Sequence, residues 1–146
     1  MTLGSDLRSN QVCGDRVDVL GGSHFRHDGG RRARHDQAEL GALHGFVVAM
    51  VCAAYGISRA ELMSPSRNRA PVARARQVAM YLEHVVAGLS MTTVGLLFGR
   101  DRTTASHACR LIEDERDNPK VDLVLEILAA TLIGWWRQDC RSQDAA

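Results

Sequence analysis

The run RDRTTASHACR, at residues 100–110, contains side chains suited to binding another molecule. Arginine presents a planar fork of donors that matches guanine edges and phosphates, and threonine offers both a hydroxyl and a methyl group. If the run is helical, its apolar and polar residues fall on opposite faces. The inward set is Ala105, Ala108, Leu111 and Ile112, and the outward set is Arg102, Thr103, Ser106, His107 and Arg110. Such an outward face suits the major groove of DNA.

A second short helix is expected before this run and completes a helix-turn-helix. Residues 91–98 have the helical apolar spacing, and Ser90 is suited to cap their first turn. Residues 99–101 form the turn, and Asp101 is suited to cap the helix that follows. The expected inward residues of the first helix are Val94, Leu97 and Phe98. A helix pair used only for packing has the same pattern, so the residues alone leave that alternative open.

Four further helices are expected around this pair. Apolar residues recur near every 3.6 positions from about residue 36 to 55, from 71 to 87 and from 120 to 136. A short helix follows Ser58, where Glu61 completes a capping box. With helices over 91–98 and 102–115, the sequence predicts an all-α, six-helix bundle containing a helix-turn-helix.

The chain divides into three parts. Residues 1–36 are rich in glycine and charge without a sustained period, so we expect a disordered, flexible N-terminal arm. The helix-turn-helix domain is expected over 37–137, and a C-terminal tail over 138–146.

Charge is distributed unevenly between these parts. The net charge is only +1, but residues 59–112 contain eight arginines and three acidic residues, for a net charge of +5. Residues 113–146 carry a net charge of −4. The concentrated positive block indicates a polyanionic partner.

Several other classes of protein are not supported. There is no GxxxxGK[ST] phosphate-binding loop, and the longest apolar run, residues 46–55, is about half the length of a membrane span. His24 and His27 lack the further ligands of a metal site, and His107 and Cys109 do not share a helix face. The first twenty residues lack the apolar region of a secretory signal, so we expect none. We therefore expect a cytoplasmic protein that is not an enzyme and has no metal, no cofactor, no nucleotide and no membrane partner.

Three stretches together resemble one known family. They are YGISRAELMS (55–64), VARARQVAMYL (72–82) and LSMTTVGLLFGRDRTTASHACRLIE (89–113). They are similar to the C-terminal DNA-binding domain of the bacterial replication initiator DnaA, and the resemblance extends over about residues 38–136. It implies a six-helix domain whose helix-turn-helix binds DnaA boxes, which are short asymmetric duplex sites, as a monomer.

The resemblance implies which residues read the bases. Arg102, Thr103 and Thr104 occupy the family's major-groove positions, Asp101 stands just before them, and His107 matches the histidine of the family signature. The family usually has histidine at the position of Arg102. Because arginine favours guanine whereas histidine favours a thymine methyl group, we expect a different preferred base there. A phosphate contact by Arg102 is the alternative.

Other arginines are implied to contact the DNA backbone or the minor groove. Arg76 corresponds to a likely phosphate contact in the family's basic helix. The family's minor-groove arginine corresponds to Arg67 or Arg69, and the sequence does not decide between them. The remaining expected backbone or minor-groove contacts are Arg74, Arg100 and Arg110.

Together these observations predict a sequence-specific reader of double-stranded DNA that regulates transcription or modulates replication initiation. The family also has an ATPase domain that these 146 residues do not include, so we expect a stand-alone, nucleoid-associated reader. Transcription or replication proteins are the expected protein partners. The alternative is a protein-interaction module that keeps the fold without DNA binding and uses the apolar final helix. Trp135 and Trp136 either serve such a partner or close the core.

Overall fold

The structure is a computed structural model that describes residues 37–66 and 69–144. Within these residues the chain forms six α-helices and one π-helical segment, with no strand, and the all-α prediction is confirmed. The helices are α1 (Gln37–Tyr55), α2 (Arg59–Met63), α3 (Ala70–Tyr81), α4 (Met91–Leu97), α5 (Arg102–Glu115) and α6 (Pro119–Asp144), and the π-helical segment η1 is Leu82–Val86. The expected N-terminal arm lies outside the described residues.

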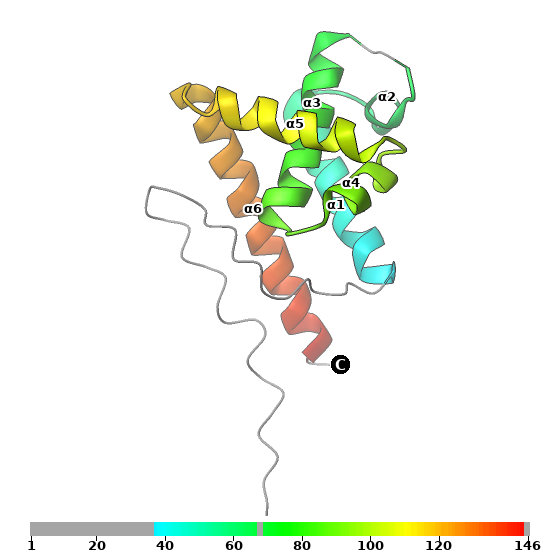
Figure 1. The fold of residues 1–146 in the computed structure, drawn as a ribbon. Helices are drawn as coiled ribbons and strands as arrows, with labels where there is room; N and C mark the ends of the chain where they lie inside the picture. The colour runs from blue at the N-terminus through cyan, green and yellow to red at the C-terminus, as the bar shows by residue number, and fades with distance from the viewer. Residues whose placement is uncertain (1–36, 67–68, 145–146) are drawn as a thin grey trace, which may run out of the picture.

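The helix α3 occupies the centre of the bundle. It packs against α1, α2 and α5, and α6 packs against α1 and η1. In Figure 1, α5 runs across the upper part of the bundle, from α4 on the right towards the beginning of α6 on the left. The DNA-binding candidate α5 therefore rests on a central helix that the rest of the core holds in place.

The helix α1 is apolar along its length because it supplies much of this core. Leu43, Val47, Val48 and Val51 are each at most 1% exposed. Among the described helices, α1 is the one long and apolar enough to cross a membrane by length and composition alone. Its packing against α2, α3 and α6 accounts for the same composition.

One long helix is predicted over residues 71–87, and the structure replaces its last turns with η1. The amide of Ala87 donates to the carbonyl of Leu82 at 3.0 Å, a five-residue spacing that defines the π-helix. Glu83 lies in this segment and is fully buried, with Oε1 2.6 Å from Nδ1 of His44 in α1. Burial raises the pKa of the Glu83 carboxyl group. The pair ties η1 to α1 by a polar contact inside the core.

The final helix is longer than the sequence predicts. We expected it to end at Trp136, but α6 continues to Asp144. Residues 137–144 contain neither glycine nor proline, so no helix breaker stops it, and the expected tail is helical as far as Asp144. Trp135 stacks on Phe46 of α1, with ring centroids 4.5 Å apart. Trp135 and Trp136 both pack against the core, which favours the core-closing interpretation of these residues.

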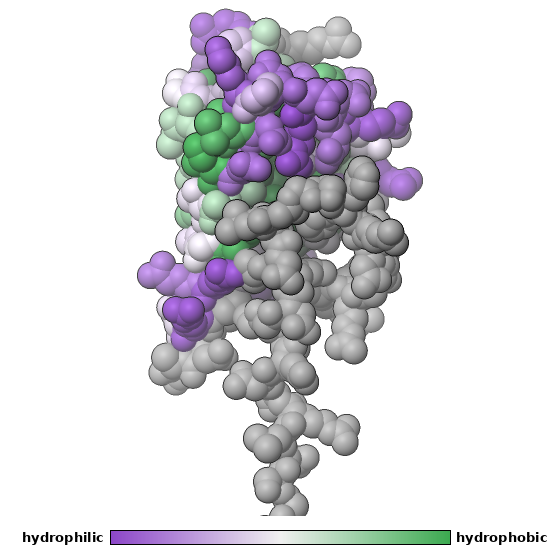
Figure 2. Space-filling model, turned by 90° about the vertical axis from the view of Figure 1, so that its left-hand side faces the viewer, coloured by the Kyte–Doolittle hydropathy of each residue, from purple (hydrophilic) through white to green (hydrophobic). Residues whose placement is uncertain are grey.

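The outer face of α6 is apolar as well. Leu123 and Ile127 are each 57% exposed, and Val124 is 42% exposed. Thr131 continues the same face, and its hydroxyl donates to the carbonyl of Ile127 at 2.8 Å. Figure 2 shows an apolar patch among hydrophilic residues on the side of the molecule where α6 begins. This face remains without a packing partner among the described residues.

Candidate nucleic-acid interface

The helices α4 and α5 form the helix-turn-helix that the sequence predicts. Ser90 caps α4 by accepting a hydrogen bond from the amide of Thr93 at 3.1 Å. Gly99 takes a φ of +61° in the turn, a conformation that side chains disfavour. Gly95 lies against that turn so closely that a Cβ added to it would lie 2.8 Å from the carbonyl oxygen of Arg100. Two glycines therefore allow the close approach of α4 and the turn.

The inner face of α5 is anchored to the rest of the bundle. Ala105 and Ile112 are fully buried and Ala108 is 2% exposed, as predicted, while Leu111 is half-buried. Cys109 is also buried, with Sγ 4.0 Å from the carbonyl oxygen of Met80 in α3. Burial raises the pKa of the Cys109 thiol to about 11, so the thiol is neutral at physiological pH. Its role is packing.

The outer face of α5 presents the predicted base-reading residues to solvent. These residues make no side-chain hydrogen bond or ion pair with the part of the chain that the structure describes. All are exposed, and they are Arg102, Thr103, Thr104 and His107, with Asp101 directly before the helix. Arg110, which we expected to contact the DNA backbone or the minor groove, is exposed on the same helix. An arginine-rich and threonine-rich helical face with uncommitted donors is what groove recognition requires.

Asp101 begins α5 without capping it. Its backbone has the extended conformation of an N-cap residue, but its side chain makes no capping hydrogen bond, contrary to our expectation. The side chain is exposed. The first-turn amides of α5 therefore have no capping side chain, and such amides favour anionic groups such as phosphate.

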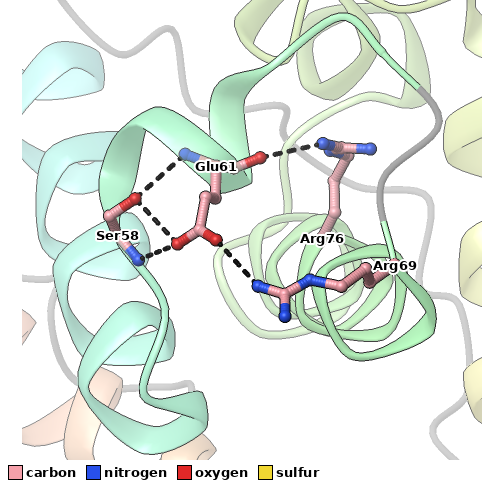
Figure 3. A network of polar contacts seen from close by, with 4 residues as sticks. All are labelled: Ser58, Glu61, Arg69 and Arg76. Carbon is pink, nitrogen blue, oxygen red and sulfur yellow. Dashed lines mark hydrogen bonds and ion pairs between the residues drawn. The ribbon is translucent and has the colours of Figure 1, made fainter.

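The helix α2 directly precedes the basic segment, which is residues 64–69 and contains Arg67 and Arg69. The carboxylate of Glu61 accepts hydrogen bonds from the amide and the hydroxyl of Ser58, both at 2.9 Å, which confirms the predicted capping box. The hydrogen bond from the Ser58 amide is the main reason that the pKa of Glu61 is lowered. Figure 3 shows that the same carboxylate meets Arg69, whose Nη2 donates to Oε1 at 3.3 Å. The Arg69 side chain is 82% exposed and remains accessible to a partner.

Arg76, predicted to contact phosphate, instead lies inside the protein. It is 9% exposed, and its guanidinium donates to three backbone carbonyls at the end of α2. Nε donates to Leu62 at 2.7 Å, and Nη2 donates to Glu61 at 3.3 Å and to Ser64 at 3.0 Å. Burial lowers the pKa of Arg76, and the nearby charge of Arg100 lowers it further. This placement favours a structural contact within the chain over the phosphate contact.

Two more of the predicted backbone-contacting arginines have partners within the chain. Arg74 is ion-paired with Glu115 at the end of α5, and its side chain is 22% exposed. Arg100, in the turn, donates from Nη2 to the carbonyl oxygen of Ser64 at 3.0 Å. Arg67 lies outside the described residues, so the structure does not decide between it and Arg69 for the minor groove.

The C-terminal half of α5 is held by a polar cluster that the sequence does not reveal. Tyr81 donates to Glu113 Oε1 at 2.9 Å and accepts from Arg116 Nη1 at 3.0 Å, and Arg116 Nε donates to Asp122 at 2.7 Å. Burial, and then the hydrogen bond to Glu113, raise the pKa of Tyr81 to about 12. The cluster joins α3, α5 and α6, so it sets the direction in which α5 points.

Comparison with known proteins identifies the same domain. Residues 46–112 match the family described as "Bacterial dnaA protein helix-turn-helix". The match begins within α1 and ends within α5, so it includes α4, the turn and α5 as far as Ile112. Over these residues the chain resembles the C-terminal helix-turn-helix domain of bacterial DnaA proteins, as the motifs predict.

Individual relatives and a solved structure agree with this match. The chromosomal replication initiator protein DnaA of Mesorhizobium japonicum is 36% identical over 109 residues, which is 74% of this chain and 20% of that protein. The DnaA of a Caulobacter species is 43% identical over 82 residues, which is 55% of this chain and 17% of that protein. The chain thus spans about a fifth of the length of these relatives. A crystal structure described as a DNA replication initiation factor aligns with a TM-score of 0.58 and 28% identity, over 65% of this chain and 29% of the other.

Proposed function

From its resemblance to the helix-turn-helix domain of bacterial DnaA proteins, we propose that this chain binds double-stranded DNA sequence-specifically at sites related to the DnaA box. Occupancy of such sites in the nucleoid regulates transcription or modulates replication initiation. Transcription or replication proteins are its protein partners.

The observation that carries the proposal is the outer face of α5. Arg102, Thr103 and His107 are exposed and make no side-chain hydrogen bond or ion pair with the described residues, although the helix that carries them is firmly packed. A rigid helix with free donors pays little ordering entropy when it enters a groove. Polar residues kept for solubility alone need no such rigid support.

The other expected DNA contacts are made by exposed arginines and by the first-turn amides of α5. Arg110 lies on the same helix and is exposed, so we assign it to a phosphate. Arg69 or Arg67 enters the minor groove beside it. The uncapped amides that follow Asp101 bind a further phosphate.

The experiment that tests this function is a selection of bound duplexes from a random pool at near-physiological salt. The expected product is an asymmetric motif related to the DnaA box. Binding to that motif weakens with salt, with a log–log slope of about −0.9 for each phosphate neutralised. No enrichment above background, together with no salt-dependent binding, would contradict the proposal.

The same selection, repeated with Arg102→His, tests whether Arg102 reads a base. If Arg102 reads guanine, the variant recovers a motif that differs from that of the wild type at one position and is similar elsewhere. An unchanged motif with a slope reduced by about one would instead place Arg102 on a phosphate.

A second function, protein binding through α6, is favoured by one observation. Leu123, Val124 and Ile127 form an exposed apolar face opposite the packed side of the helix. Substituting Ile127→Glu distinguishes the two functions, because it leaves the DNA-binding face of α5 intact. If the chain acts only through a protein partner, the purified wild type enriches no duplex in the selection. The Ile127→Glu variant then loses the effect on transcription or replication initiation.

A further inference from the structure

One backbone carbonyl joins the two halves of the proposed DNA-binding surface. The oxygen of Ser64 accepts a hydrogen bond from Arg76 Nη2 and another from Arg100 Nη2, each at 3.0 Å. Ser64 directly follows α2 and begins the segment that leads to Arg69. Arg100 belongs to the turn before the recognition helix. Residues 36 positions apart in the sequence therefore meet at one atom.

Arg76, in α3, holds the Ser64 carbonyl in place. Its guanidinium also holds the carbonyls of Leu62 and Glu61, so the last turn of α2 is fixed to α3 by three hydrogen bonds. Hydrogen bonds from a charged donor are stronger than those between neutral groups. Figure 3 shows Arg76 reaching from α3 to the residue that also meets Arg69.

Arg100 connects the same carbonyl to the turn between α4 and α5. Its amide donates to Gly95 of α4 at 2.8 Å, so the backbone that carries the side chain is itself held. The side chain then crosses to Ser64 rather than extending to solvent, and it is half-buried. A displacement of the basic segment therefore has to break a contact with the turn.

We propose that Arg100 and Arg76 are positioning residues that fasten the basic segment after α2 to the turn of the helix-turn-helix through the Ser64 carbonyl. Arg69, which is ion-paired with Glu61 of α2, and the recognition helix then meet one duplex at a fixed separation, so that contacts in the minor and the major groove form together. The inference rests on the proposed DNA-binding function. It removes both arginines from the set of phosphate contacts.

A double-mutant cycle tests the coupling. The segment variant replaces Arg67 and Arg69 with alanine, so it removes the minor-groove contact whichever residue makes it. In the wild-type background we expect it to weaken binding to the selected site about tenfold or more. In the Arg100→Ala background, where Ser64 has lost its contact with the turn, the same change should weaken binding only about twofold.

Arg110→Ala is the matched control for Arg100→Ala. It removes the same charge from the same helix-turn-helix, but Arg110 is exposed and makes no side-chain hydrogen bond or ion pair with the described residues. Its effect should add to that of the segment variant and reduce the salt slope by about one. If Arg100→Ala behaves as Arg110→Ala does, Arg100 is an independent phosphate contact and the inference is overturned.

A measurement without DNA separates the inference from the proposed function. Amide hydrogen exchange of residues 62–64 and 66 should be faster in Arg100→Ala than in the wild type by about tenfold, because a charged hydrogen bond is lost, and unchanged in Arg110→Ala. Unchanged exchange in folded Arg100→Ala refutes the fastening, whatever the DNA result. Faster exchange in a protein whose wild type selects no duplex refutes the DNA-binding function and leaves the fastening in place.

Discussion

Gly95→Ala tests whether the turn fixes the position of the recognition helix. A Cβ at this position lies 2.8 Å from the Arg100 carbonyl oxygen and 3.1 Å from both the Arg102 nitrogen and the Asp101 carbonyl carbon. All three atoms belong to the backbone, so no side chain can rotate away to relieve the contact. The substitution therefore forces α4 and the beginning of α5 apart.

The size of the effect follows from two opposing contributions. Alanine in a helix is about 0.5–1 kcal/mol more favourable than glycine, whereas overpacking a tight contact costs about 1–3 kcal/mol. Gly41→Ala provides a matched control, because Gly41 is exposed in α1 and a Cβ there meets nothing within 4 Å. The helix contribution is shared by both variants. The free energy of unfolding of Gly95→Ala should therefore be about 1–3 kcal/mol lower than that of Gly41→Ala.

Urea denaturation followed by far-ultraviolet circular dichroism measures this difference directly. In thermal denaturation, each kcal/mol corresponds to about 4–8 °C for a domain of this size. Gly95→Ala should also lose affinity for the selected duplex at a temperature where it is fully folded, since α5 is displaced. If Gly95→Ala is as stable as Gly41→Ala, the turn is not closely packed and the reasoning fails.

Three further predictions concern caps, the buried pair and base reading. Ser90→Ala should lower the free energy of unfolding by about 1 kcal/mol, because Ser90 caps α4. Asp101→Ala should change it little, because Asp101 makes no capping hydrogen bond, and urea denaturation compares the two variants. Glu83→Ala should lower it by about 3–5 kcal/mol, because it leaves His44 buried without its partner, and a loss under about 1 kcal/mol would contradict that role. Thr103→Ala should weaken binding to the selected site by about 1–3 kcal/mol and leave binding to random duplex unchanged; equal losses on both would place Thr103 on the backbone.

Features that depend on neighbouring residues were predictable from the sequence. The capping box of Ser58 and Glu61 spans three residues, and the helix stop at Gly99 depends on its own backbone conformation. The inward face of α5 follows from the helical period alone, which is why Ala105 and Ile112 were correctly placed. Each of these signals lies within one or two helical turns, so no knowledge of the tertiary fold is required.

Features that depend on distant partners were not predictable. His44 and Glu83 are 39 residues apart, and nothing in their types distinguishes a buried pair from two exposed residues. The end of α6 was missed for a different reason. The polar residues after Trp136 resemble a tail, but helix α6 continues because no breaker interrupts it.

The arginines of residues 59–112 show how placement changes the meaning of a charge count. Arg76 and Arg100 bind backbone carbonyls, and Arg74 is paired with Glu115, so these guanidiniums are directed into the domain. Those that stay exposed among the described residues are Arg59, Arg69, Arg102 and Arg110. Replacing Arg76 or Arg110 changes the net charge equally, yet the first loosens the support of the surface and the second removes a contact from it. Net charge thus indicates the class of partner, whereas burial and hydrogen bonding indicate which arginines reach it.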